Sequence, residues 1–165
     1  MKAVVVYESL WGNTAAVARE IAAGLGGETR ALNTAEATAE AIDGVDLIVA
    51  GAPVFAFHLS SDRAREDIRR NPGMDAPPPD LSHPSLRSWL DALPAGHGFS
   101  AAFDTQVPGP FGKGAPAIAK ELEAKGFTRL AEPTGFMVKG KYGPHRPGEL
   151  ERARAWGAEL AGRMG

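Results

Sequence analysis

The chain has 165 residues, of which 44% are hydrophobic and 23% charged, proportions typical of a globular domain with one sizeable core. A formal net charge of -2 gives no electrostatic case for nucleic acid or an anionic membrane surface, and the lack of cysteine excludes disulfides, thiolate catalysis and cysteine-ligated metals. The apolar run near the N-terminus, residues 3–6, is too short for a signal peptide or a membrane span. We therefore expect one cytoplasmic domain over residues 1–165 that binds neither nucleic acid nor membrane.

The first elements follow a strand, corner and helix pattern. Residues 3–6 form a β-branched run without polar alternation, which predicts a strand buried on both faces, as in a parallel sheet. Residues 14–25 carry apolar side chains four positions apart and end at a glycine pair, which predicts an amphipathic helix. The pattern then repeats, with a weak strand over 29–32, an alanine-rich helix over 34–42 and a strong buried strand over 46–51.

The second half of the chain continues this alternation. Apolar spacing and flanking glycines predict three helices, over 84–93, 115–125 and 148–164. Two further strands are predicted over 98–103 and 129–138, the second interrupted by a proline. Five strands alternating with helices predict an α/β fold with a doubly wound five-stranded parallel sheet.

One segment departs from the alternation, at about residues 58–80. It contains a very polar helix candidate, "SSDRAREDIRR", followed by the proline-rich "NPGMDAPPPD". The mixed charges over 62–70 are typical of a solvated helix face. We interpret the segment as an irregular polar insertion, and three roles stay open for it: a cover over the binding edge, a spacer or a partner-docking surface.

In open parallel sheets, ligands bind outside the carboxyl ends of the strands, so the loops that follow the strong strands are the candidate sites. The first loop, residues 8–14, offers hydroxyl and amide side chains and a glycine directly before a helix. Helix N-terminal N–H groups attract anions, so this corner is suited to a phosphate without a lysine or arginine. A helix cap by Asn13 or Thr14 is the alternative interpretation.

Two later loops complete the predicted edge. Residues 52–57 contain a proline, a valine and two phenylalanines, which either line a flat ligand or fold back over the core. Asp104, Thr105 and Gln106 come directly after a strand, where they either meet the edge of a ring or serve turn chemistry.

These sequences resemble the flavodoxin-like family, which binds flavin mononucleotide (FMN). "SLWGNT" is similar to the family's phosphate loop, "DLIVAGAPVF" to its third strand and first flavin-ring loop, "AAFDTQ" occupies the place of its second ring loop, and "GAPAIAKELEAKGF" is similar to its late helix. The resemblance implies the strand order 2-1-3-4-5 and noncovalent FMN. The residues that it implies are Ser9, Trp11, Gly12, Asn13 and Thr14 for the phosphate, Pro53, Val54 and Phe55 for one side of the ring, and Asp104, Thr105 and Gln106 for its other edge.

The resemblance also implies a redox role, either electron transfer or two-electron reduction of a small acceptor such as a quinone. The partner would be a redox protein or a small molecule. Trp11 stands where the family's electron carriers usually have threonine, and residues 54–58 lack the glycine whose peptide flips to stabilise one-electron-reduced flavin. The net charge is also less negative than in those carriers. A flavin-free binding or interaction module on the same fold is the alternative.

The four histidines show no metal-ligand spacing, so we expect no metal site and predict surface positions for most of them. They are His58, His83, His97 and His145. His58 follows the first ring loop, where it either donates a proton near the flavin or is an exposed loop residue. Trp89 and Trp156 lie on predicted helices and are expected to be packing residues.

Overall fold

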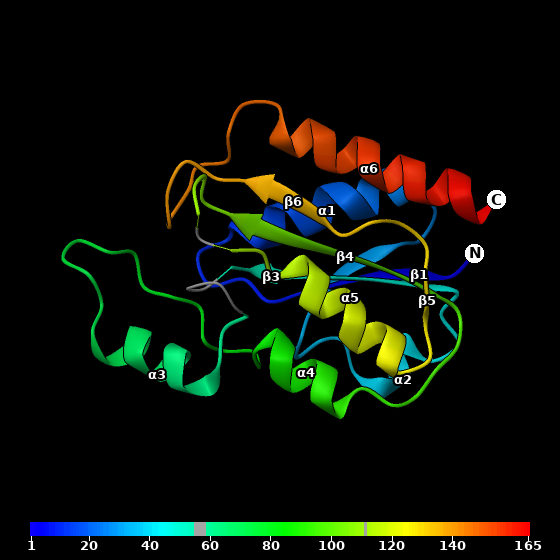
Figure 1. Cartoon of the computed structure of the whole chain (residues 1–165), viewed down its shortest axis with the longest axis horizontal. Helices are drawn as coiled ribbons and strands as arrows, with labels where there is room; N and C mark the ends of the chain where they lie inside the picture. Colours follow the sequence, from blue (N-terminus) through cyan, green and yellow to red (C-terminus); the bar gives the residue numbers. More distant parts are fainter. Residues whose placement is uncertain (55–58, 111) are drawn as a thin grey trace.

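The computed structural model describes residues 1–54, 59–110 and 112–165 (Figure 1). Its sheet is parallel throughout, with the order β2-β1-β3-β4-β5, and β6 also pairs with β4. The strands are β1 (Ala3–Tyr7), β2 (Arg30–Asn33), β3 (Leu47–Pro53), β4 (Phe99–Gln106), β5 (Thr128–Arg129) and β6 (Thr134–Met137). The predicted strand order is confirmed.

Helices cover both faces of the sheet. They are α1 (Asn13–Leu25), α2 (Ala39–Ile42), α3 (Asp62–Arg70), α4 (Leu86–Ala92), α5 (Ala115–Ala124) and α6 (Glu149–Met164). In Figure 1, α1 and α6 lie on one face, and α2, α4 and α5 on the other. The central strands β1 and β3 are therefore apolar on both sides, as their unbroken valine and isoleucine runs predicted.

Two glycines allow α1 and α6 to approach each other closely. A Cβ atom on Gly24 would lie 2.0 Å from the carbonyl oxygen of Arg154, and one on Gly157 would lie 2.2 Å from that of Ile21. Backbone thus packs directly on backbone. The same face buries Trp156, while Trp89 is buried under the opposite face, so both tryptophans are packing residues as expected.

The second predicted helix is much shorter than 34–42. The side-chain oxygen of Asn33 accepts hydrogen bonds of 2.9 Å from the N–H groups of both Ala35 and Glu36, which forms a turn in place of the first helical residues. Helix α2 begins only after Thr38, whose hydroxyl accepts a hydrogen bond from the N–H of Ala41.

The last predicted strand is split. Proline has no N–H to donate to a ladder, and Pro133 separates β5 from β6, although both pieces pair with β4. Strands β3 and β4 run two or three residues beyond their predicted ends, so their final residues, Pro53 and Gln106, belong to the sheet.

The insertion holds the polar helix α3, which Figure 1 shows standing away from the sheet. The charge pattern predicted that this helix is solvated on its polar face, but one of its charged residues is buried. Arg65 is buried, and its guanidinium lies 3.4 Å from the carboxylate of Glu8, which is fully buried. One arginine therefore anchors the helix to the end of β1. In the described residues, every helix is too short or too polar to cross a membrane.

Candidate functional site

A cavity of about 460 Å³ lies at the carboxyl ends of β1, β3 and β4, beside the start of α1. Its volume is within the range of small-molecule sites. It is lined by Ser9, Leu10, Trp11, Asn13, Thr14, Pro53, Val54, Thr105, Val107, Val138 and Lys141. The structure thus brings residues from all three predicted loops to one place, as the topology of a parallel sheet requires.

The first loop turns sharply into helix α1. Gly12 has a φ of 89° and occupies the N-cap position, where a side chain would be strained. The hydroxyl oxygen of Ser9 accepts hydrogen bonds from the N–H groups of Gly12, at 3.1 Å, and Ala15, at 3.2 Å. The interpretation of Asn13 or Thr14 as the cap is therefore wrong. Among the described residues, the N–H groups of Asn13 and Thr14 have no hydrogen-bond partner, so they remain donors for an anion.

A hydroxyl pair joins the first and third loops. The side-chain oxygens of Thr14 and Thr105 lie 2.8 Å apart, and both residues are buried. Each hydroxyl can donate as well as accept, so the pair presents polar groups to the cavity without a fixed charge.

The neighbours of Thr105 have a different role. The carboxylate of Asp104 is buried and accepts hydrogen bonds of 2.9 Å from the N–H groups of Gly114 and Ala115, at the start of α5. Gln106 donates its side-chain N–H to the other oxygen of Asp104, at 2.6 Å. Neither side chain lines the cavity. Only Thr105 of this predicted trio faces the site, and Asp104 instead stabilises a helix start.

The first ring loop is described only in part. Pro53 and Val54 line the cavity, and the N–H of Val54 is fixed by a 3.0 Å hydrogen bond to the carbonyl of Thr105. Phe55 and His58 lie outside the described residues. Val107 and Val138 add apolar wall that the sequence reasoning missed.

A lysine that sequence reasoning also missed lies at the cavity. Lys141 lines it from the turn after β6, and its Nζ atom is 5.3 Å from the centre of the Trp11 ring and 5.7 Å from that of Tyr142. The two rings meet edge to face at 4.9 Å. The local sequence of the first loop contains no lysine or arginine, but the fold brings the cation of Lys141 to this corner. The signal was available, because the rule for carboxyl ends of strands applies to the last strand too.

The end of the insertion is hydrogen-bonded to three successive residues of the first loop. The indole N–H of Trp11 donates to the carbonyl of Pro77 at 3.0 Å, and the N–H of Asp80 donates to the carbonyl of Leu10 at 2.8 Å. The third bond runs from the backbone N–H of Ser9 to Nε2 of His83, at 3.1 Å. We call residues 77–83 the clasp.

The sequence predicts a surface position for His83, but the residue is buried and its ring accepts the hydrogen bond from Ser9. Acceptance at Nε2 places the ring proton of the neutral form on Nδ1, which is 3.8 Å from the Asp80 carboxylate. Burial lowers the pKa of His83 from its ordinary value, the charge of Arg65 acts in the same direction, and Asp80 and Glu36 oppose it. Burial therefore favours the neutral form of His83, which is the form that can accept the hydrogen bond from Ser9.

Glu8 and Arg65 together connect the end of β1, the insertion helix and the clasp. The carboxylate of Glu8 accepts hydrogen bonds from the N–H of Leu86 at 2.9 Å and from the hydroxyl of Ser60. Arg65 bridges from this carboxylate to the carbonyl of His83. Burial raises the pKa of Glu8, and the Leu86, Ser60 and Arg65 contacts oppose that rise.

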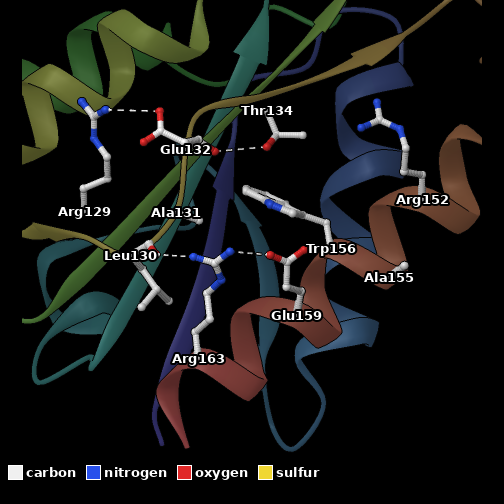
Figure 2. A pocket seen from close by; sticks show the side chains of 10 residues that line it. All are labelled: Arg129, Leu130, Ala131, Glu132, Thr134, Arg152, Ala155, Trp156, Glu159 and Arg163. Atoms are coloured by element: carbon white, nitrogen blue, oxygen red, sulfur yellow. Dashed lines mark hydrogen bonds and ion pairs between the residues drawn. The ribbon is translucent and has the colours of Figure 1, made fainter.

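A second cavity, of about 500 Å³, lies between α6 and the break between β5 and β6 (Figure 2). Figure 2 shows Arg163 between the carbonyl of Leu130 and the carboxylate of Glu159, and Arg129 facing Glu132. Arg152, the third arginine of this cavity, pairs with Glu149, so all three arginines that line it are already ion-paired. Because this cavity is also away from the carboxyl ends of β1 and β3, it is the weaker candidate. Among the described residues, no group of three or more histidines and acids could hold a metal ion.

Comparisons with known proteins agree with this geometry. Residues 4–67 match a family model described as a flavodoxin domain. A flavodoxin from the domain Archaea superimposes with a TM-score of 0.69 at 19% identity, over 99% of this chain and 98% of that one. Flavodoxin 1 from Bacillus cereus gives 0.64 at 18% identity, over 98% of both chains. A comparison with curated protein sequences gives no match.

A third similar structure is a longer chain, and only part of it matches this protein. The Flv1 flavodiiron core from Synechocystis sp. PCC6803 gives a TM-score of 0.63 at 17% identity, and the match covers 98% of this chain but 35% of that one. Identities this low establish a shared fold. The whole chain therefore has the fold of the flavodoxins, and residues 4–67 also match a flavodoxin domain in sequence.

Proposed function

We propose that the chain binds FMN noncovalently in the 460 Å³ cavity and acts as a redox protein. The observation that carries this proposal is the start of α1, where the N–H groups of Asn13 and Thr14 are left as donors at the same cavity as the Thr14–Thr105 hydroxyl pair. The flavodoxin domain match and the flavodoxin structures support FMN as the cofactor.

Each wall of the cavity has a separate task in this proposal. The amides of α1 and the hydroxyl of Thr14 hold the phosphate, because a helix N-terminus favours negative charge. Pro53, Val54 and Val107 flank the ring with apolar surface. When bound, the flavin supplies the redox chemistry, and the protein supplies binding, orientation and electrostatics.

We infer that two-electron reduction of a small acceptor such as a quinone is favoured over one-electron transfer. The loop over residues 54–58 contains no glycine, so it lacks the peptide that the family's electron carriers use to stabilise one-electron-reduced flavin. Stepwise photoreduction of the FMN-loaded protein tests this inference. Little one-electron-reduced flavin in the visible spectrum agrees with it, and extensive accumulation contradicts it.

The binding proposal is tested by the visible spectrum of the purified protein and by quenching of FMN fluorescence on titration. The variant Asn13→Ala/Thr14→Ala keeps both N–H groups but loses the Thr14 hydroxyl and the Asn13 side chain, so it should bind FMN more weakly, while Thr128→Ala, on the distant strand β5, should bind it as the wild type does. A colourless wild-type protein that leaves FMN fluorescence unquenched would support the flavin-free binding module instead.

A further inference from the structure

The turn after β6 is built to hold one lysine at the phosphate side of the cavity. The N–H of Gly143 donates to the carbonyl of Gly140 at 2.9 Å, which closes a four-residue turn with Lys141 and Tyr142 at its centre. The base of the turn is fixed by a 2.8 Å hydrogen bond from the N–H of Lys139 to the carbonyl of Pro144.

This turn is attached to the first loop itself. The His145 ring nitrogen Nε2 lies 2.8 Å from the carbonyl oxygen of Asn13. A Cβ on Gly143 would lie 2.5 Å from the side-chain oxygen of Asn13, so the backbone of Gly143 packs against the Asn13 side chain, and its φ of 94° also favours glycine. Because Asn13 is proposed to bind the phosphate, these contacts fix the turn next to the phosphate-binding loop.

Aromatic rings set the direction of the lysine side chain. The ammonium group lies within cation–π range of both Trp11 and Tyr142. The Trp11 ring is in turn held by its hydrogen bond to Pro77 of the clasp. Among the described residues that line the cavity, Lys141 is the one with a formal charge.

We propose that Lys141 is a phosphate-binding residue and that it makes the site select FMN over the unphosphorylated flavin, riboflavin. This inference rests on the proposed function, because it assigns a residue to the phosphate of the same ligand. Amides and hydroxyls supply directed hydrogen bonds, and the lysine adds the cation that a phosphate dianion attracts. The insertion contributes indirectly, since the clasp holds Trp11 and Trp11 holds the lysine.

The experiment compares the Kd values of FMN and riboflavin for the wild type, Lys141→Met and Lys141→Arg, by flavin fluorescence quenching. Lys141→Met should weaken FMN binding about tenfold and leave riboflavin binding unchanged. Its FMN binding should also depend less on salt than that of the wild type, whereas Lys141→Arg should retain most of the selectivity. Lys120→Met, which removes an exposed lysine of α5, is the control and should bind both flavins as the wild type does.

The outcomes separate this proposal from the one on which it rests. If the wild type binds FMN but Lys141→Met keeps the same ratio of FMN to riboflavin affinity, the role of Lys141 is overturned and FMN binding stands. Equal losses for both flavins also overturn it, because they indicate a packing defect. If the wild type binds neither flavin, both proposals fail.

Discussion

The backbone N–H of Ser9 donates its hydrogen bond to Nε2 of His83, so a histidine 74 positions along the chain holds the first loop in place. The bond exists only while Nε2 is unprotonated. Protonation would replace the acceptor with a second donor and set two donors against each other. The hydrogen bond that holds the first loop therefore depends on pH through the protonation of the His83 ring.

We expect this link to appear in the pH dependence of stability. The pKa of His83 is lowered in the folded protein, whereas in the unfolded chain it is about 6.5. The unfolded state therefore takes up the proton first. The stability that neutral His83 provides is fully present above about pH 6.5 and declines as the pH falls through that value toward the lower folded pKa.

Urea unfolding of the wild type and His83→Gln over this pH range measures the effect. The wild type should lose stability relative to the variant on acidification, since glutamine does not titrate. His97→Gln, at an exposed histidine, should follow the wild-type curve. Parallel curves for the wild type and His83→Gln would contradict the link.

Arg65→Met should destabilise the protein strongly. It leaves the fully buried carboxylate of Glu8 without its cation, and breaking a buried ion pair in this way costs about 3–5 kcal/mol. Because protonation of Glu8 relieves the unpaired charge, the loss should shrink as the pH is lowered, as urea unfolding at several pH values would show. Arg69→Met removes an exposed ion pair with Glu66 on the same helix and should leave the stability nearly unchanged. Equal losses for the two variants would rule out the anchoring role of Arg65.

Asp104→Asn separates a structural role from a role in flavin binding. Its carboxylate accepts hydrogen bonds from the N–H groups of Gly114 and Ala115. Because the variant weakens these buried hydrogen bonds, it should lose about 1–3 kcal/mol of stability. FMN affinity should change little, because the side chain does not line the cavity. Thr14→Val, which removes a cavity hydroxyl, should reduce FMN affinity clearly. Thermal unfolding and FMN titration of both variants test this contrast, which the reverse pattern would refute.

Gly157→Ala should weaken the packing of α6 on α1. The added methyl would lie 2.2 Å from the carbonyl oxygen of Ile21, and relief of such overpacking costs about 1–3 kcal/mol. Gly162→Ala, on the same helix, meets nothing within 4 Å and should instead stabilise by about 0.5–1 kcal/mol. Urea denaturation of the two variants gives the comparison, and a neutral Gly157→Ala would show that the helices separate easily.

The fold could be predicted because its signals are local. Buried strands such as 3–6 and 46–51 are apolar runs, and glycines mark the ends of the helices. The same holds for Ser9 and Thr14, which follow a strand and precede a helix. The contacts of the clasp could not be predicted, because no local pattern links His83 to Ser9 or Pro77 to Trp11 across such long stretches of chain.

The position of Asp104 at the end of a strand could be predicted, but its role could not. A carboxylate at the end of a strand suits either a ligand or a neighbouring helix start, and the sequence does not distinguish them. The hydrogen bonds to α5 decide the matter. Lys141 follows the last strand in a loop that matches no motif of the family, and only the topology of the sheet brings that loop to the cavity.

The proline that divides β5 from β6 has a consequence for the protein in a concentrated solution. A sheet with such apolar central strands would offer a second molecule a template for strand addition if its outer edge were long and straight. Here the edge consists of two short pieces, Thr128–Arg129 and Thr134–Met137, separated by residues 130–133, of which Pro133 has no N–H group. The interruption therefore protects the chain against edge-to-edge aggregation.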